Sequence, residues 1–176
     1  MRRRRIIVVL PAAISSLIML ASIAWFAGLR INLTRSYPLG LWRIEPLGGP
    51  PAVGDLVFIC PPDSAAFRMA RERGYLGRGL CRGWFSPLIK TVVATEGQTI
   101  AIGAGVSIDG HPLPHSDLRR TDAAGRELTA FAGGPVSYGS LFLHSDFAGS
   151  YDSRYFGPIP ASGLLGRAHP LLTFEP

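Results

Sequence analysis

The segment from Pro87 to Thr95 reads Pro-Leu-Ile-Lys-Thr-Val-Val-Ala-Thr. Apolar and β-branched residues dominate it, a composition typical of a strand with a buried face. Lys90 lies in its middle and is the only lysine among 18 basic residues, the others being arginines. Lysine can lose its proton when it is buried, whereas arginine effectively cannot.

We therefore interpret Lys90 as an amine that becomes neutral and works as a base. Its pKa would have to fall by roughly three units from about 10.4 to act near pH 7, and burial among apolar side chains can cause such a shift. The alternative is a lysine on an edge strand, where the charge deters aggregation.

Short apolar runs separated by turn residues recur on both sides of this segment. Gly (21) and Pro (15) are plentiful, which favours strands joined by turns over a helical bundle. Asp109-Gly110 is a hairpin-turn signal. Ser64–Arg73 reads as a helix that Gly74 stops, and the polar segment 114–134 reads as an excursion from the sheet. The sequence predicts a mainly β domain over residues 31–176 with strands at Leu39–Glu45, Asp55–Cys60, Leu88–Thr95, Thr99–Ile102, Val106–Asp109, Ser140–His144 and Leu171–Phe174.

Residues 1–30 have a different character. Four arginines at positions 2 to 5 precede an uncharged, largely apolar run that ends before Arg30. At about 24 residues the run is long enough to cross a hydrocarbon core of roughly 30 Å as one helix. The positive block predicts a cytoplasmic N-terminus, a single membrane-spanning helix and an exported β domain. A cleavable signal peptide ending at Ser22-Ile23-Ala24 is the alternative, but the apolar run exceeds the usual core of roughly 7–15 residues.

Export changes how the two cysteines are interpreted. Cys60 and Cys81 are the only cysteines, and in an oxidising compartment such a pair is expected to form one disulfide. Without a flanking His or Cys pattern they make a poor zinc site, so we expect no metal. The net charge is +6, and four of the positive charges belong to the N-terminal arginines. The remaining arginines are scattered, which argues against a nucleic-acid partner.

A second segment with chemical character runs from Asn32 to Trp42. Ser36 lies shortly after the apolar run, Pro38 fixes the backbone beside it, and Gly40 permits a geometry that other residues resist. A serine in so constrained a turn can be held exposed, as a nucleophile needs. The alternative is an ordinary loop serine.

A third segment, from Leu143 to Gly157, is dense in short hydrogen-bonding side chains. A buried amine base needs a neutral acceptor to orient it, and a serine hydroxyl serves without restoring the proton as a carboxylate would. Asp152 and Arg154 are spaced for a local ion pair that stiffens the loop. A solvated turn is the alternative interpretation.

The three segments together resemble one family. Thr34-x-Ser36-x-Pro38-x-Gly40 resembles the nucleophile box of type I signal peptidases, in the variant found in conjugative-transfer (TraF-type) peptidases. Lys90-Thr-Val-Val is similar to the lysine box. The segment from Ser150 to Gly157 is similar to the last and most specific box. The resemblance implies a signal-peptidase-like, β-rich catalytic core with a Ser–Lys dyad.

Residue by residue, the resemblance implies that Ser36 is the nucleophile and Lys90 the general base. It implies that Ser150 orients Lys90, and that the Thr34 hydroxyl and the Ser36 backbone N–H form the oxyanion hole. Two further residues would brace the site, Asp152 and Arg154.

The sequence also departs from the family pattern. Tyr37 stands where general signal peptidases usually have Met, and Thr91 replaces an arginine that often follows the lysine. His144-Ser145-Asp146 replaces the usual Gly-Asp-Asn. These departures weaken an assignment as a general signal peptidase that removes leader peptides and leave the dyad intact.

By resemblance, the expected activity is that of a serine endopeptidase acting through an acyl-enzyme, with no cofactor. The expected partners are the cytoplasmic membrane and an exported protein substrate, with the conjugative pilin precursor leading. Water would resolve the acyl-enzyme to a cut chain, and the substrate's own N-terminal amine would resolve it to a ring.

Two rival hypotheses remain open on the sequence. One is a Ser–His–Asp protease that uses His144 and Asp146. The other is a non-catalytic assembly factor of a pilus or export apparatus that keeps the fold. His111 and His115 are interpreted as loop residues and not as metal ligands, because the intervening prolines forbid a shared helical face.

Overall fold

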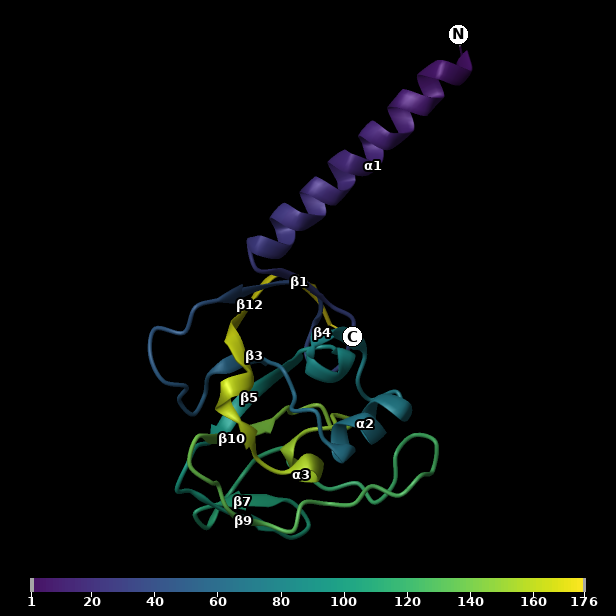
Figure 1. Ribbon diagram of the computed structural model, residues 1–176. Helices are drawn as coiled ribbons and strands as arrows, with labels where there is room; N and C mark the ends of the chain where they lie inside the picture. Colours follow the sequence, from purple (N-terminus) through teal and green to yellow (C-terminus); the bar gives the residue numbers. More distant parts are fainter. Residues whose placement is uncertain (1, 176) are drawn as a thin grey trace.

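A computed structural model describes residues 2–175 of the protein. A helix, α1 (Arg2–Phe26), projects from a β-rich domain as a long arm (Figure 1). It covers most of the apolar run for which the sequence predicts a membrane-spanning helix. In the part of the chain that the structure describes, no helix combines the length and the apolar character required to cross a membrane.

The domain contains two sheets. Within residues 2–175 the larger sheet has seven strands and the smaller has four. The larger sheet has the order β1 (Leu29–Asn32), β2 (Leu39–Glu45), β12 (Leu164–Phe174), β3 (Leu56–Ile59), β5 (Leu88–Ala94), β10 (Ser140–His144) and β11 (Ile159–Pro160). The smaller has the order β8 (His111–Pro112), β7 (Val106–Ile108), β6 (Thr99–Ile102) and β9 (Gly134–Pro135). The mainly β prediction is confirmed.

The segment from Pro87 to Thr95 contains β5, which lies near the centre of the larger sheet. It pairs antiparallel with β3 on one side and β10 on the other. Side chains alternate between the faces of a strand, and β5 obeys this rule: Ile89 packs against Trp42 and Phe58 on one face. Leu88 and Val92 join a second core on the opposite face. Lys90 lies between Leu88 and Val92 on the same face of β5, and its side chain is therefore buried.

The C-terminal strand is longer than the sequence predicts. Only Leu171–Phe174 reads as a strand, yet β12 begins at Leu164 and lies between β2 and β3. Pro170 and Gly166 interrupt the alternating pattern, and the register shifts near both. Gly166 is required where it stands, because a Cβ there would lie 2.3 Å from the Glu45 carbonyl oxygen and its φ is +148°.

The junction between α1 and the sheet is tightly fastened. The Gly28 carbonyl accepts a hydrogen bond of 2.8 Å from the Ile44 backbone N–H. A Cβ on Gly28 would lie 2.6 Å from the Ile44 oxygen, so glycine is needed at this close approach. The Arg30 guanidinium stacks 3.5 Å from the centre of the Trp25 ring and donates to the Trp25 carbonyl at 3.1 Å. Strand β1, which follows at once, was not predicted.

The excursion between β3 and β5 carries α2 (Ala65–Glu72), β4 (Arg78–Cys81) and the 3-10 turn η1 (Arg82–Trp84). The helix prediction is confirmed, with Ser64 as N-cap and Arg73 as C-cap. Phe67 of α2 packs into the core of the larger sheet. A disulfide joins Cys60 to Cys81, with 5.5 Å between their Cα atoms, and so closes the base of the excursion.

In the smaller sheet, β6 and β7 lie where the sequence predicts strands, whereas β8 and β9 were not predicted. Asp109 (φ 51°) and Gly110 (φ 82°) make the turn between β7 and β8. The segment 113–133 contains only an isolated bridge between Thr121 and Glu127 within the described residues. It runs along the surface beside α2 and α3 (Ser153–Phe156), and α3 was not predicted.

Candidate active site

Ser36 lies in a turn between β1 and β2 that a single asparagine organises. Asn32 ends β1 and is only 7% exposed. Its Oδ1 accepts hydrogen bonds from the Thr34 backbone N–H at 3.0 Å and from the Thr34 hydroxyl at 2.7 Å. Its Nδ2 lies 3.0 Å from each of the carbonyl oxygens of Thr34, Tyr37 and Pro38, so its two N–H groups are shared among three acceptors. One buried amide thus fixes the backbone on both sides of Ser36.

Three contacts fasten this turn to the central strands. The Ser145 hydroxyl, just beyond β10, donates to the Ser36 carbonyl at 2.6 Å. The Tyr37 hydroxyl lies 2.6 Å from the Thr91 hydroxyl of β5 and 3.3 Å from the His144 carbonyl of β10. Four of the residues at which the sequence departs from the family pattern therefore take part in holding the Ser36 turn in place.

The structure brings together Ser36, Lys90 and Ser150, which are far apart in the sequence. Lys90 is 3% exposed, and its Nζ donates to Ser150 Oγ at 2.9 Å. The Ser36 hydroxyl donates to the same Ser150 oxygen at 3.3 Å. The hydroxyl and the amine thus share one hydrogen-bond partner, and the direct neighbour of Lys90 in this arrangement is Ser150.

The buried position of Lys90 changes its acidity. Desolvation lowers the pKa of Lys90 from 10.5 to about 8; the negative charge of Asp152 opposes this shift and the positive charge of Arg154 adds to it. A substantial fraction of the amine is therefore neutral in mildly alkaline solution. A neutral amine can accept a proton from a neighbouring hydroxyl, which an ammonium cannot.

A pH profile follows from this shift. If neutral Lys90 is the base, kcat/KM should rise about tenfold per pH unit below pH 8 and level off above it, because only the deprotonated enzyme reacts. Initial rates on a peptide substrate between pH 5.5 and 9.5 would measure the profile. A plateau that already begins below pH 6 would mean that a group other than Lys90 limits the reaction.

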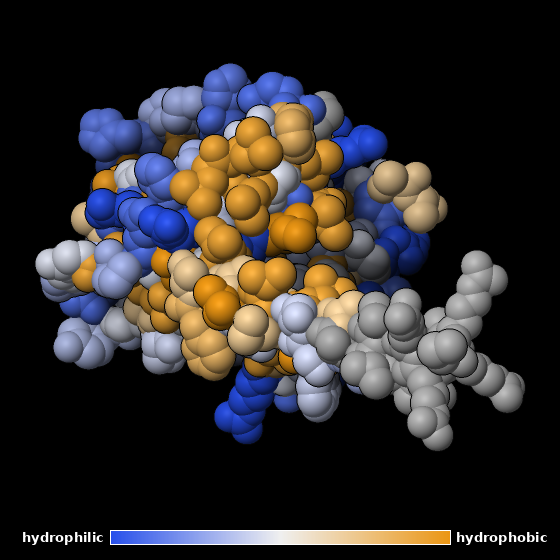
Figure 2. All heavy atoms as spheres, turned by 90° about the horizontal axis from the view of Figure 1, so that it is seen from above, coloured by the Kyte–Doolittle hydropathy of each residue, from blue (hydrophilic) through white to orange (hydrophobic). Residues whose placement is uncertain are grey.

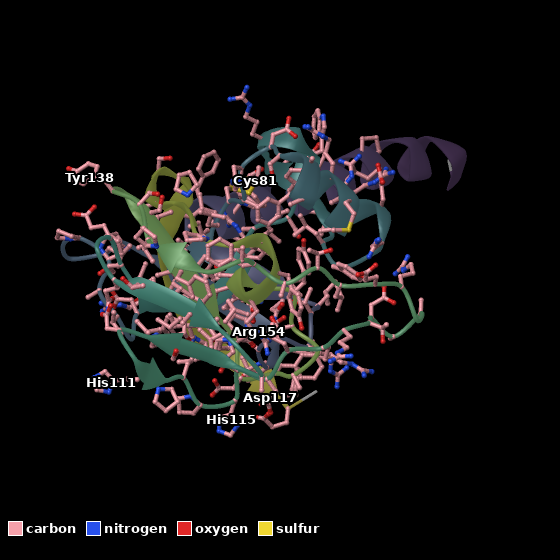
Figure 3. The ribbon with its side chains drawn as sticks, turned by 90° about the horizontal axis from the view of Figure 1, so that it is seen from below. Cys81, His111, His115, Asp117, Tyr138 and Arg154 are labelled. Atoms are coloured by element: carbon pink, nitrogen blue, oxygen red, sulfur yellow. A yellow bond between two sulfur atoms is a disulfide. The ribbon has the colours of Figure 1, made fainter. Side chains whose placement is uncertain are left out.

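A buried ion pair stiffens the loop that carries Ser150. Asp152 and Arg154 are both 0% exposed. Arg154 Nε donates to one Asp152 oxygen at 2.8 Å and Nη2 to the other at 2.9 Å, a two-pronged contact. Arg154 also donates to the carbonyls of Ser150 at 3.3 Å, Phe147 at 3.4 Å and Asp117 at 3.0 Å. Figure 3 shows Arg154 inside the domain with Asp117 near it.

Asp152 satisfies several partners at once. It caps α3 by accepting from the Arg154 backbone N–H at 3.1 Å, and it accepts from the Ser145 backbone N–H at 3.2 Å. Burial alone would raise the pKa of Asp152, but His144, Arg154 and the charge of Lys90 outweigh it, so the pKa lies below its ordinary value. The carboxylate therefore stays ionised and remains paired with the Arg154 guanidinium.

His144 contributes its backbone carbonyl, and not its ring, to the Ser36 turn. His144 is 2% exposed, with Nδ1 3.4 Å from Asp152 and Nε2 3.6 Å from Asp146. Among the hydrogen bonds of residues 2–175, none joins the His144 ring to Ser36. This geometry does not favour the Ser–His–Asp rival. His111 and His115 are exposed, and Figure 3 shows both at the edge of the domain.

The expected oxyanion donors are only partly free. The Thr34 side chain is exposed, but its hydroxyl donates to Asn32 and would have to rotate to face a substrate. The Ser36 backbone N–H has no acceptor among the described residues, so it is available to a developing oxyanion.

A cavity of about 350 Å³ opens onto Ser36 and Lys90. One wall comes from residues 74–77, which belong to the excursion that the disulfide closes. Another wall is the segment 86–89 that leads into β5, and Phe147 and Tyr151 complete the lining. The cavity is open at the surface and borders a strand, as an extended peptide would require.

Sequence reasoning gave no role to Asn32 or Ser145. A signal for Asn32 was available: it is the only asparagine in the chain, and asparagine side chains readily bond to backbone groups two residues further on. No comparable signal marks Ser145, because its partner Ser36 is 109 residues away.

We expect Asn32→Ala to lower kcat/KM by about 100-fold, mostly through kcat, because a small displacement of a nucleophile has an effect of that order. Asn32→Asp should be similarly impaired, since it keeps the acceptor for Thr34 and loses the N–H groups that face the three carbonyls. Gln98→Ala removes a surface amide that bonds Thr95 and Asp109 and serves as the control. A loss confined to thermal stability, with kcat intact, would contradict a positioning role.

Comparisons with known proteins agree with the geometry. The family model described as signal peptidase, peptidase S26, matches residues 2–172. A probable conjugal transfer protein TraF of Sinorhizobium fredii (strain NBRC 101917 / NGR234) is 59% identical over 88% of this chain and 82% of its own length. A conjugal transfer protein TraF of Agrobacterium tumefaciens (strain 15955) is 54% identical over the full length of both chains. A plasmid transfer protein TraF of Escherichia coli is 38% identical over 89% of this chain and 90% of its own.

Proposed function

Because the chain belongs to the S26 family of signal peptidases, we propose that it is a serine endopeptidase of conjugative transfer that processes the pilin precursor. Ser36 is the nucleophile and Lys90 the general base. The observation that carries the proposal is the single Ser150 oxygen within hydrogen-bonding distance of both the Ser36 hydroxyl and the Lys90 amine. The names of the relatives support the link to conjugation.

The first chemical step needs a small rearrangement of hydroxyls. Ser150 orients the Lys90 amine, and a rotation of the Ser36 side chain brings its proton to the neutral amine. Ser36 Oγ then attacks the peptide carbonyl, and the Ser36 N–H with the Thr34 hydroxyl stabilises the negative oxygen. Lys90 passes the proton to the leaving amine, which leaves an ester between Ser36 and the acyl part of the substrate.

A second nucleophile resolves this ester. Water yields a linear product, and the N-terminal amine of the same chain yields a ring. In each case Lys90 accepts the proton of the attacking group and returns it to Ser36 Oγ as the ester bond breaks. Asp152 and Arg154 act through the loop that holds Ser150 and touch no reacting atom.

We also propose that residues 6–29 anchor the enzyme in the cytoplasmic membrane with its catalytic domain in the periplasm. The block of arginines at positions 2 to 5 supports this orientation. The face from which α1 leaves the domain carries many apolar side chains (Figure 2), and Ile31 and Leu33 near it are 72% and 82% exposed. The Cys60–Cys81 disulfide suits an oxidising compartment.

Mass spectrometry of a candidate pilin precursor, incubated with the full-length enzyme in membranes, would test the proposal. The wild type should release a defined fragment, and the acyl part should appear either at its linear mass or one water lighter as a ring. Ser36→Ala should give neither product. Ser64→Ala is a matched control, because this helix-capping serine makes no side-chain hydrogen bond at the cap.

Two results would contradict the proposal. Normal processing and pilus formation by Ser36→Ala would favour a non-catalytic assembly factor. Efficient cleavage of unrelated exported precursors, with pilin left uncut, would favour a general signal peptidase.

A further inference from the structure

A second cavity adjoins the candidate active site and has no role in the steps above. It measures about 260 Å³. The loop of residues 147–151 lines both cavities, through Phe147, Gly149 and Tyr151, so it forms the ridge between them. Ser150, whose hydroxyl bridges Ser36 and Lys90, belongs to this ridge. The second cavity is therefore next to the reacting groups.

Aromatic rings form one wall of this cavity. Tyr151 packs between two other tyrosines, with ring centres 5.1 Å from Tyr75 and 5.8 Å from Tyr155, and the latter pair is nearly parallel. The Tyr75 hydroxyl donates to Asp122, and the Tyr155 hydroxyl accepts from the Arg119 backbone N–H at 3.1 Å. These bonds fix the polar ends of two rings.

The remaining lining is mostly apolar and its one acidic side chain is neutralised. Leu128, Ala123 and Ala148 contribute aliphatic surface. Asp122 accepts hydrogen bonds from the Tyr75 hydroxyl and from Arg126, and these hold the pKa of Asp122 well below its ordinary value. Its charge is therefore compensated within the protein. Arg119 is the other charged residue of the lining, and the largely apolar remainder of the cavity suits an apolar side chain.

A third cavity shows in which order the cavities follow one another along the surface. It measures about 350 Å³ and is lined by Trp25 and Arg30 at the end of α1. It shares Leu33, Gly77 and Pro87, among others, with the cavity at Ser36, and shares no lining residue with the cavity beside the tyrosines. Within the described residues, the cavity at Ser36 thus lies between the other two.

We infer that the tyrosine-walled cavity is a subsite for the leaving segment of the substrate, where it takes an apolar or aromatic side chain from one of the first two residues after the cut. The inference rests on the proposed function, in which α1 anchors the enzyme in the membrane. If the part of the substrate before the cut enters along the cavity beside α1, the segment released at Ser36 continues on the other side of the 147–151 ridge.

Burial of the side chain sets the size of the effect. Adding or removing a small apolar group in a hydrophobic pocket changes kcat/KM by roughly 10–200-fold. Part of this cavity is open to solvent, so we expect the lower end of that range. A peptide with Phe or Leu at the favoured position should be cut about tenfold faster, in kcat/KM, than one with Ser.

The test uses full-length enzyme in detergent micelles and peptides that span the pilin cleavage site. The peptides differ only at the first or the second residue after the cut, which is Phe, Leu, Ser or Asp. Leu128→Asp places a charge in the cavity, and Ala123→Phe fills it. Leu165→Asp is the matched control, because Leu165 is an exposed leucine of β12 that lines none of these three cavities.

The quantity compared is the ratio of kcat/KM for the Phe and Ser peptides. A ratio near ten in the wild type and in Leu165→Asp, which falls to about one in both cavity variants, supports the subsite. A ratio near one in the wild type overturns it, as does a preference that both cavity variants retain. A ratio of kcat/KM that depends on the residue before the cut, and not on the residue after it, would also overturn the subsite. Absence of any Ser36-dependent cleavage would be a separate result that overturns the proposed function and the subsite with it.

Discussion

Replacing Lys90 by methionine is expected to abolish cleavage and, at neutral pH, to stabilise the folded protein. Loss of the general base from a serine peptidase lowers kcat by at least about 10⁴-fold. The pKa of about 8 in the folded state, against 10.5 when solvated, means that burying the charged amine costs roughly 3 kcal/mol below pH 8. Methionine has a similar shape and carries no charge, so we expect a gain of about 2 kcal/mol in the free energy of unfolding.

The pH dependence of this gain supplies its own control. Between about pH 8 and 10.5 the unfolded wild type binds one proton more than the folded form, so the wild type becomes more stable as the pH rises. The advantage of Lys90→Met should therefore shrink over that window, as urea denaturation at pH 7 and pH 10 would measure. Lys90→Arg, which stays charged, should be inactive and destabilised. Retained cleavage by Lys90→Arg would contradict the proposal that Lys90 is the general base.

Arg154→Ala is expected to have the largest effect on stability. It leaves the Asp152 carboxylate buried without its two-pronged partner, and breaking a buried pair on one side costs about 3–5 kcal/mol. It also frees the carbonyls of Ser150 and Phe147. The loop that carries the bridging hydroxyl should loosen, so activity should fall together with the free energy of unfolding.

The exposed pair between Arg167 and Asp55 provides a matched control. Its N–O distance is 2.9 Å, close to that of the buried pair, but the Arg167 side chain is 52% exposed. Arg167→Ala should cost no more than about 1 kcal/mol. The double variant Asp152→Ala/Arg154→Ala should lose less stability than the two single changes added together, because it leaves no unpaired charge. Equal effects of Arg154→Ala and Arg167→Ala would show that burial does not strengthen this pair.

The parts of the fold that sequence predicted well are those with local causes. Strands β5 and β10 are rich in apolar and β-branched side chains, Asp109-Gly110 suits a tight turn, and Ser64 and Gly74 bracket α2. Each of these signals lies within a short window of the sequence. The buried lysine was identifiable from the composition of the whole chain, because the chain uses arginine at every other basic position.

The parts that sequence missed depend on partners far along the chain. The first half of β12 is a strand because β2 and β3 flank it, although Gly166 and Pro170 break its pattern. The hydroxyl of Ser150 was expected to orient Lys90, but its contact with Ser36, 114 residues away, could not be read from any local pattern. The same holds for the bond from Ser145 to the Ser36 carbonyl.

The fastened junction after α1 has a consequence for where the enzyme can cut. Gly28 is bonded to β2, Arg30 clasps Trp25, and β1 runs directly into the turn that Asn32 holds. With Ser36 as the proposed nucleophile and α1 as the proposed anchor, this junction leaves few residues between the membrane and the hydroxyl, so we expect the distance of the hydroxyl from the membrane surface to vary little. Peptide bonds at other distances from the membrane should then stay uncut, however well their side chains would fit.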